Sequence, residues 1–249
     1  MTETLKVYLY DDNLKSRAEK LAESLDLPLI ASHPTEKESF KICFGDSMVY
    51  LQGDGMDLIP DFMDLKERVK PGRLNTEVLV KACRVKCENQ ITVFDATAGL
   101  GEDSFILAAA GFNVILYEKD PVIYELLLNA WERGRENPEI GAILSRMHIY
   151  SGDSTVYLKS LNNKPQVVLL DPMFPERKKS GLIKKKFQLL QKLESPCDNE
   201  DSLMEAALIG AGKRIVIKRP VKGPNLAGRK PDFSYPGKAV RYDCILINS

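Results

Sequence analysis

The sequence predicts an α/β fold, in which a mostly parallel β-sheet carries helices on both faces. Residues 91–120 (ITVFDATAGLGEDSFILAAAGFNVILYEKD) have the pattern of a strand, a glycine turn, a helix and a second strand. Strand-like and helix-like segments continue to alternate after this unit, as they do in sheets built from parallel crossovers. Residues 167–170 (VVLL) form a continuous apolar run, which is typical of a central parallel strand buried on both faces.

A smaller unit is expected before this sheet. Its segments have, in chain order, the patterns of a strand, an amphipathic helix and the two strands of a hairpin: residues 6–10, 14–25, 40–44 and 48–51. Gly45 and Asp46 are expected to form the turn of the hairpin. We therefore expect a small α/β unit over residues 1–60 and a second domain over residues 61–249.

The polar segment that follows the small unit shows no clear hydrophobic periodicity. It contains Arg68 and Arg73, which we expect to contact a polyanionic partner. Asn75 or Thr76 could cap a helix that extends to about residue 85.

The glycine turn of residues 91–120 predicts a nucleotide site. Its first strand ends in Asp95, and the turn then contains Gly99 and Gly101, which allow a ligand to approach the backbone closely. The next helix directs its first N–H groups to the same place. Glu118 ends the second strand about 20 residues after the turn, where an acidic residue can bind a ribose diol.

The residues around the turn favour one nucleotide cofactor over another. A dinucleotide site has a third glycine where this chain has Ser104, which argues against a nicotinamide oxidoreductase. Glu102 and Asp103 would repel a pyrophosphate, whereas they suit the cationic S-adenosylmethionine. With Asp95 and Glu118, they favour a methyltransferase over a crossover that binds no ligand.

Further polar residues follow the third strand of this series. Residues 122–135 have a helical pattern with Pro121 at its start, and residues 147–150 are expected to form the strand. Asp153 and Ser154 come directly afterwards. They could contact an adenine amino group, cap the next helix, or do both.

The fourth strand, residues 167–170, ends in the motif DPMFP. Ligands in open α/β sheets bind outside the carboxyl ends of the strands, so this motif should lie beside the glycine turn. The carboxylate of Asp171 and the carbonyl of Pro172 can accept the two hydrogens of an exocyclic amine. Phe174 can stack on the base. The alternative interpretation of the motif is structural: the prolines only stiffen the chain where it leaves the strand.

Positive charge is concentrated in the residues that follow this motif in the sequence. Residues 1–175 hold 19 Lys and Arg against 27 Asp and Glu, net −8, and residues 176–249 hold 16 against 8, net +8. Six cations lie within ten residues: Arg177, Lys178, Lys179, Lys184, Lys185 and Lys186. Such a cluster predicts salt-dependent binding of a nucleic acid, although a solvated surface is the common alternative.

The chain then returns to the sheet. Residues 214–218 are expected to form the fifth strand, followed by a Pro-, Gly- and Lys-rich mobile loop to residue 236 and a last strand at 240–247. We expect Lys218 and Arg219, at the end of the fifth strand, to hold the phosphate backbone of the substrate.

Several classes of protein are disfavoured by composition. No apolar run approaches the ~20 residues of a membrane helix, and the N-terminus has no signal-peptide pattern. The five cysteines include no C-x-x-C pair, so neither a metal site nor a disulfide framework is expected. We expect a cytoplasmic protein with reduced thiols that needs no membrane and no metal.

Four stretches, DATAGLGEDSFILA, LYEKDP, QVVLLDPMFPERKKS and RIVIKRP, together closely resemble the RsmJ family. These are bacterial 16S rRNA guanine-N2 methyltransferases of class I that use S-adenosylmethionine. The resemblance extends from about Leu58 to the C-terminus and implies a Rossmann-like, seven-stranded sheet. It also implies 16S rRNA or the small ribosomal subunit as partner. The cofactor contacts that it implies are Glu102, Asp103, Glu118, Lys119, Asp153, Ser154 and Asp171.

The reaction implied is a direct methyl transfer to guanine N2, in which positioning supplies most of the rate. Three alternatives remain open, one of which is the nicotinamide oxidoreductase that Ser104 argues against. The chain could be another amino methyltransferase, acting on adenine N6 in DNA or on a protein glutamine, because related D-P-x-F motifs serve those reactions too. It could also be a non-catalytic RNA-binding module, which would not need the cofactor site.

Overall fold

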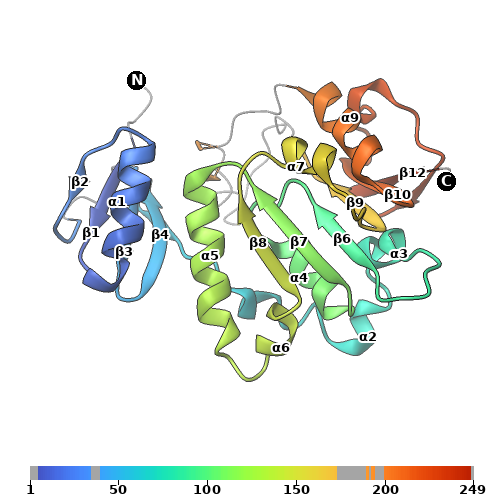
Figure 1. The fold of residues 1–249 in the computed structure, drawn as a ribbon. Coiled ribbons are helices and arrows are strands. Elements are labelled where there is room, and N and C mark those ends of the chain that lie inside the picture. Colours follow the sequence, from blue (N-terminus) through green and yellow to red (C-terminus); the bar gives the residue numbers. More distant parts are fainter. Residues whose placement is uncertain (1–4, 35–39, 173–188, 191, 194–198, 248–249) are drawn as a thin grey trace.

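The computed structural model describes residues 5–34, 40–172, 189–190, 192–193 and 199–247, which form two β-sheets (Figure 1). The smaller sheet has the order β2-β1-β3-β4-β5, and the larger has the order β11-β12-β10-β9-β6-β7-β8. In Figure 1 the smaller sheet and its helix α1 lie to one side of the larger sheet, and the long helix α5 lies between them.

The smaller sheet is built from the first 58 residues. Its elements are β1 (Lys6–Leu9), η1 (Asp12–Leu14), α1 (Lys15–Ser24), β2 (Leu29–Ile30), β3 (Lys41–Gly45), β4 (Met48–Gly53) and β5 (Met56–Leu58). The predicted hairpin is confirmed as β3–β4, but Gly45 pairs with Met48, so the turn consists of Asp46 and Ser47. Both turn residues have positive φ, as a two-residue hairpin turn requires.

Helix α5 (Pro121–Arg135) fixes the smaller sheet to the rest of the chain. Its Ile123 packs with apolar residues of α1, β3 and β4 in one buried cluster. The side-chain amide of Asn129 accepts a hydrogen bond from Val49 N (2.9 Å) and donates one to Ser47 O (3.1 Å). These bonds satisfy backbone groups of the hairpin, so the two units pack through a polar contact as well as an apolar one.

A linking region of short helices leads to the larger sheet. It contains η2 (Phe62–Leu65), α2 (Pro71–Leu74) and α3 (Val78–Cys83). The predicted cap of α3 is wrong: the helix begins after Glu77, and the hydroxyl of Thr76 donates to the carbonyl of Arg73 (2.7 Å). Asn75 and Thr76 instead lie directly after α2, where the Thr76 hydroxyl bonds back to that helix.

The larger sheet has seven strands, and all except β12 run parallel to one another. They are β6 (Thr92–Asp95), β7 (Asn113–Glu118), β8 (Met147–Ser151), β9 (Val167–Leu170), β10 (Arg214–Pro220), β11 (Phe233–Pro236) and β12 (Val240–Leu246). The predicted fold class is therefore confirmed. The strand order reverses at β6, which lies between β7 and β9, and open α/β sheets bind ligands at such a point.

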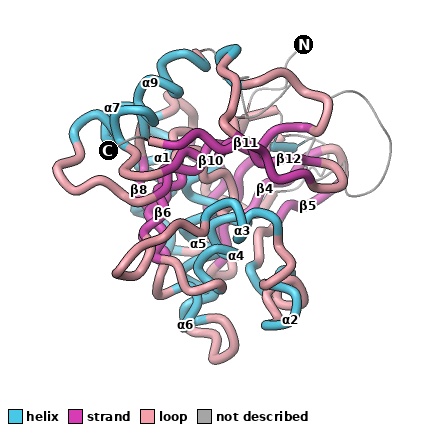
Figure 2. Tube along the Cα trace, turned by 90° about the vertical axis from the view of Figure 1, so that its right-hand side faces the viewer, coloured by secondary structure: helices cyan, strands magenta, loops and turns pink. Residues whose placement is uncertain are grey.

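Helices cover both faces of this sheet (Figure 2). Besides α5 they are α4 (Glu102–Ala109), α6 (Gly141–Leu144), α7 (Ser154–Ser160), α9 (Glu200–Gly210) and the short η3 (Leu226–Gly228). Val167 and Leu169 of β9 pack with α4, while Val168 and Leu170 pack with α7 and α9. All four are fully buried, which confirms the prediction of a strand covered on both faces. None of the helices in the described residues is long and apolar enough to cross a membrane.

The segment after β10 was predicted to be a loop as far as residue 236, but its last four residues form β11 (Phe233–Pro236) instead. The guanidinium of Arg241 donates to the backbone carbonyls of Pro220, Val221 and Gly223, at 2.8 to 2.9 Å. Arg219 donates to a further carbonyl of the same loop. The side chains of two arginines therefore bond to the backbone of the loop that precedes β11.

Candidate active site

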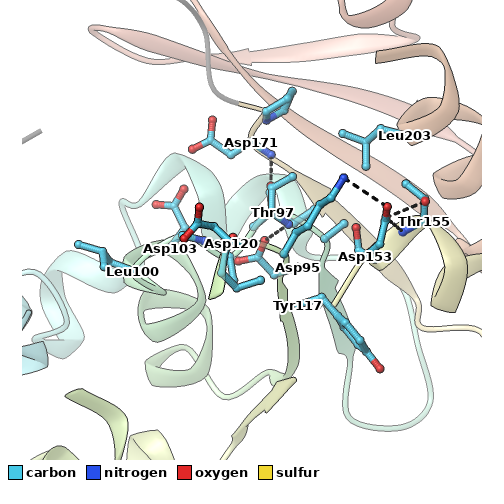
Figure 3. Close-up of a pocket in the computed structure, with 18 of the residues that line it drawn as sticks. Asp95, Thr97, Leu100, Asp103, Tyr117, Asp120, Asp153, Thr155, Asp171 and Leu203 are labelled. Carbon is cyan, nitrogen blue, oxygen red and sulfur yellow. Dashed lines mark hydrogen bonds and ion pairs between the residues drawn. The ribbon is translucent and has the colours of Figure 1, made fainter. Parts of the chain in front are cut away.

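A pocket of about 820 Å³ opens at the carboxyl ends of β6, β7, β9 and β10, where the strand order reverses (Figure 3). It gathers most of the residues that the sequence predicted for the cofactor and for catalysis: Asp95, Gly99, Glu102, Asp103, Glu118, Lys119, Asp153, Ser154, Asp171 and Pro172. Lys218, which was predicted for RNA, lines the same pocket. In Figure 3, Asp153 and Thr155 lie at one end, Leu100 and Asp103 at the other, and Asp171 lies above Thr97.

One side of the pocket, the β6–β7 wall, consists of residues 95–100 and 117–120. At its centre, Gly99 N donates to Glu118 Oε2 and Asp120 N donates to Glu118 Oε1, both at 2.8 Å. Burial raises the pKa of Glu118 to about 7, although these two bonds favour the ionised form. Each carboxylate oxygen keeps further acceptor capacity, so Glu118 is held in place and can still accept ligand hydroxyls.

The two glycines of the turn have different surroundings. Gly99 has φ +54°, and a Cβ there would meet no atom within 4 Å. Gly101 has φ +75° and begins α4, and a Cβ there would lie 2.7 Å from Cδ1 of Leu127. Gly99 lines the pocket and Gly101 does not. The predicted ligand approach therefore applies to Gly99, whereas Gly101 allows α4 to pack against α5.

Asp95 forms the base of the β6–β7 wall. Its side chain is almost fully buried and accepts hydrogen bonds from Ser104 Oγ (2.6 Å) and Thr97 N (3.2 Å). Burial raises the pKa of Asp95 to about 7. Ser104 occupies the place of the third glycine of a dinucleotide site, and its hydroxyl is committed to Asp95. Asp95 thus holds the turn to the helix as well as lining the pocket.

The opposite side, the β9–β10 wall, consists of Asp171, Pro172 and Lys218. Asp171 N donates to Thr97 Oγ1 at 2.6 Å, which ties this wall to the glycine turn. The ammonium of Lys218 lies 2.8 Å from Asp171 Oδ2 and 2.7 Å from Oδ2 of Asp103, the second residue of α4. Burial raises the pKa of Asp171 against the opposing effect of Lys218. Burial also opposes the charge of Lys218, but Asp103 and Asp171 outweigh it and raise the pKa of the ammonium.

Asp153 and its neighbours form the end of the pocket next to α7. Asp153 is the N-cap of this helix and accepts hydrogen bonds from Thr155 N (2.9 Å) and Thr155 Oγ1 (2.7 Å). The ammonium of Lys119 lies 3.6 Å away. Burial opposes the charge of Asp153, but the bonds from Thr155 outweigh it and lower its pKa. The predicted cap is confirmed, and the same carboxylate also lines the pocket.

The residues predicted for RNA lie in three different environments. Arg219 is 1% exposed and donates to the carbonyl of Pro224, so the prediction that it holds a phosphate is wrong. Arg68 is paired with Glu77 at 3.3 Å, and Arg73 is exposed on α2. Seven of the predicted residues lie outside the described part of the chain: Phe174, Arg177, Lys178, Lys179, Lys184, Lys185 and Lys186.

Sequence reasoning missed several residues that line the pocket: Thr97, Tyr117, Asp120, Thr155, Asn199, Ser202 and Leu203. Tyr117 stacks on Phe94, with ring centroids 5.0 Å apart, and its position directly before Glu118 was a usable indication. The last three come from α9 and its cap, far along the chain. No motif marks them, because only the packing of α9 against the sheet brings them to the pocket.

The charge of the pocket decides which ligand fits it. Seven carboxylates and two ammonium groups line it within the described residues. Such a surplus of negative charge favours a cationic ligand and opposes a pyrophosphate. The described residues contain no cluster of His, Cys, Asp and Glu that could hold a metal ion. The open side of Gly99, the bonded carboxylate of Glu118 and the acidic lining together fit S-adenosylmethionine.

Comparisons with known proteins agree with this geometry. The family model described as "Putative SAM-dependent methyltransferase" matches residues 29–247. A ribosomal RNA small subunit methyltransferase J of Thioalkalivibrio sulfidiphilus is 37% identical over 238 residues, which cover 93% of each chain. The protein of the same name in Pseudomonas aeruginosa is 38% identical over 233 residues, covering 91% of this chain and 88% of the relative.

A solved structure is similar over nearly the whole chain. It is a SAM-dependent methyltransferase from Neisseria gonorrhoeae, with a TM-score of 0.72 and 29% sequence identity, covering 97% of this chain and 96% of that one. The family model and the curated relatives each span most of the chain. The chain therefore belongs to the family of SAM-dependent methyltransferases that includes the ribosomal RNA small subunit methyltransferases J.

Proposed function

We propose that the protein transfers a methyl group from S-adenosylmethionine to the exocyclic N2 amine of a guanine in small-subunit (16S) ribosomal RNA. One observation carries the proposal. Asp171 and Pro172, directly after β9, line the same pocket as Glu118, so two groups that can accept an amine share a cavity with a carboxylate that can bind a ribose.

The β6–β7 wall binds the cofactor in this proposal. Glu118 accepts the ribose hydroxyls, and Gly99 leaves room for the ligand beside the turn. Asp153 and Ser154, at the start of α7, contact the adenine end. Glu102, Asp103 and Lys119 line the remaining part of the site, in which the acids offset the positive charge of the cofactor. When bound, S-adenosylmethionine supplies an electrophilic methyl group.

The β9–β10 wall orients the nucleophile. The carboxylate of Asp171 and the carbonyl of Pro172 accept the two N–H groups of the amine and thereby direct its lone pair toward the cofactor side of the pocket. The amine becomes positively charged as it is methylated, and the carboxylate of Asp171 stabilises that charge. A carboxylate oxygen of Asp171 can also take up the proton that the methylated amine releases. Phe174 stacks on the base.

The relatives and the charge distribution support an RNA substrate. The curated relatives are named ribosomal RNA small subunit methyltransferases, and the C-terminal third of this chain has a net charge of +8. Arg68, Arg73 and the six cations between residues 177 and 186 supply phosphate contacts in the proposal. The substrate is 16S rRNA or the small subunit in the cytoplasm.

We also propose a domain boundary near residue 60. Leu58, at the end of β5, packs in the buried cluster of the smaller sheet. Phe62, at the start of η2, packs instead in the cluster below α4. Residues 1–60 therefore form the small unit, and residues 61–249 form the methyltransferase domain.

Nucleoside analysis of treated RNA tests the proposed function. Small-subunit rRNA and assembled small subunits, both from a strain that lacks this protein, are incubated with the enzyme and methyl-labelled S-adenosylmethionine and then digested to nucleosides. We expect the label to be recovered in N2-methylguanosine. Label in N6-methyladenosine, label in protein glutamine, or no transfer to either substrate would contradict the proposal.

A further inference from the structure

Lys218, on the β9–β10 wall, connects Asp171 of the same wall to Asp103 of α4. Ile217 of β10 pairs with Leu170 of β9 in parallel register, so the next residues along the two strands, Lys218 and Asp171, lie side by side. The side chain of Lys218 is 25% exposed and reaches two carboxylates, Asp171 at 2.8 Å and Asp103 at 2.7 Å. The register of the sheet thus builds an ion pair directly at the proposed amine-binding carboxylate.

The contact with Lys218 gives the two carboxylate oxygens of Asp171 different roles. Lys218 bonds to Oδ2, and within the described residues no hydrogen bond to Oδ1 is present. The backbone N of Asp171 is already held by Thr97 Oγ1. The residue is therefore fixed at its backbone and at one side-chain oxygen, and its other oxygen is left for a ligand.

We infer that Lys218 is a positioning residue: it holds Asp171 through Oδ2 and keeps it ionised, so that Oδ1 accepts the substrate amine. This inference rests on the proposed function for the identity of the amine. A protonated Asp171 would direct an O–H group at an N–H group, and two facing donors cannot bond. The side chain of Asp171 is 34% exposed, so its charge is partly removed from water, and the ammonium of Lys218 in contact offsets that cost.

Of the other charged groups around Asp171, some oppose its ionised form and one favours it. Asp103 on α4 and Asp95 on β6 repel a charge at Asp171, and Arg219 on β10 attracts it. Tyr242 of β12 pairs with Lys218 across the sheet and adds no charge at neutral pH, because burial raises its pKa. Among the described residues, Lys218 is the cation in direct contact with Asp171, and it shares its charge with Asp103. Removing Lys218 should therefore raise the pKa of Asp171, whereas removing Asp103 should lower it.

The titration of Asp171 tests this inference without relying on catalysis. Carboxyl resonances of the full-length protein labelled with ¹³C-aspartate are followed against pH, and Asp171→Asn identifies the resonance of Asp171. We expect Lys218→Met to raise the pKa of Asp171 by about 1–3 units, because it removes an opposite charge in contact. Asp103→Asn should lower it, because the lysine then pairs with Asp171 alone. Lys218→Arg should keep it near the wild-type value.

A matched control removes a different lysine ion pair. Lys159 of α7 pairs with Glu205 at 2.7 Å on the surface, and Lys159→Met should leave the titration of Asp171 unchanged. An Asp171 pKa that stays at the wild-type value in both Lys218→Met and Asp103→Asn would overturn the inference. Because Asp103→Asn keeps the lysine, it provides the test even if Lys218→Met does not fold.

Single-turnover kinetics gives a second readout. With cofactor and RNA saturating, Lys218→Met should slow methyl transfer on the order of 10²-fold at pH 7 and move the acidic limb of its pH profile upward. Lys218→Arg should return the acidic limb of the pH profile to its wild-type position. A wild-type protein that methylates no guanine would contradict the proposed function, whereas the titration would still decide the role of Lys218. If Lys218→Met is slow but the acidic limb of its pH profile stays where it is in wild type, the inference about Lys218 is contradicted and the proposed function is not.

Discussion

The two walls of the pocket are built in different ways. The β6–β7 wall comes from one continuous stretch of about 30 residues, and backbone N–H groups of Gly99 and Asp120 hold its carboxylate, Glu118. The β9–β10 wall depends on side chains far apart in the sequence: Lys218 is 47 residues from Asp171 and 115 from Asp103. The first wall is assembled within one strand–helix–strand unit, whereas the second depends on the pairing of strands that are far apart in the sequence. We expect the first wall to determine affinity for the cofactor and the second to determine the rate.

The largest expected effect tests the β9–β10 wall. Asp171→Asn keeps the shape of the side chain but removes its charge and directs an amide N–H at the substrate amine. Single-turnover methylation with saturating cofactor should slow by about 10²–10³-fold, the cost of one lost transition-state contact. Cofactor affinity is measured in parallel, and Asp201→Asn, an exposed carboxylate on α9, serves as control. A rate within threefold of wild type would show that Asp171 does not orient the amine.

The same contrast explains what could be predicted from the sequence. Asp95, Gly99 and Glu118 follow one another within a single motif, and the structure brings them to one pocket as expected. Lys218 was assigned to the phosphate backbone because no local pattern shows that Ile217 pairs with Leu170. Arg219 was misassigned for a related reason. A basic residue beside a predicted loop is expected to be exposed, but the sequence does not show that the loop packs over it.

The next largest effect tests the β6–β7 wall. Glu118→Ala removes charge-assisted bonds to the ribose and should cost ~1.5–3 kcal/mol, or roughly ten- to a hundredfold in affinity for S-adenosylmethionine. Calorimetry measures this affinity, and the single-turnover rate at saturating cofactor should fall far less. Binding as tight as that of wild type would place the ribose elsewhere.

A pair of glycine substitutions separates structural from ligand-binding positions in the glycine turn. Gly101→Ala places a Cβ 2.7 Å from Leu127 Cδ1 at a positive φ and should lower the free energy of unfolding by about 1–3 kcal/mol. Gly99→Ala has open space and should be destabilised only by its φ, by about 1–2 kcal/mol. Chemical denaturation measures both. We expect Gly99→Ala to weaken cofactor binding more than Gly101→Ala does, and the reverse order would contradict the assignment.

The smallest effect is a pH dependence of cofactor binding. Burial raises the pKa of Asp95 and of Glu118 to about 7 in the protein without ligand, and a cationic ligand favours their ionised forms. Binding should therefore release protons, and affinity should rise severalfold from pH 6 to pH 8, with Glu118→Gln showing a shallower rise. In the ligand-free protein the same shifts stabilise the fold below about pH 4, and this contribution is lost as pH rises through 7. Thermal stabilisation by the cofactor should accordingly be greater at pH 8, and an equal shift at both pH values would contradict this.

A double-mutant cycle of Glu118→Ala and Asp171→Asn tests most directly whether the two walls have separate roles. The quantity measured is the single-turnover methylation rate of small-subunit rRNA at subsaturating S-adenosylmethionine, for wild type, both single variants and the double variant. If one wall binds the cofactor and the other orients the amine, the two losses should multiply, to roughly 10³–10⁵-fold in the double variant. A double variant no slower than Asp171→Asn alone would show that the two carboxylates act as one unit and would contradict the account.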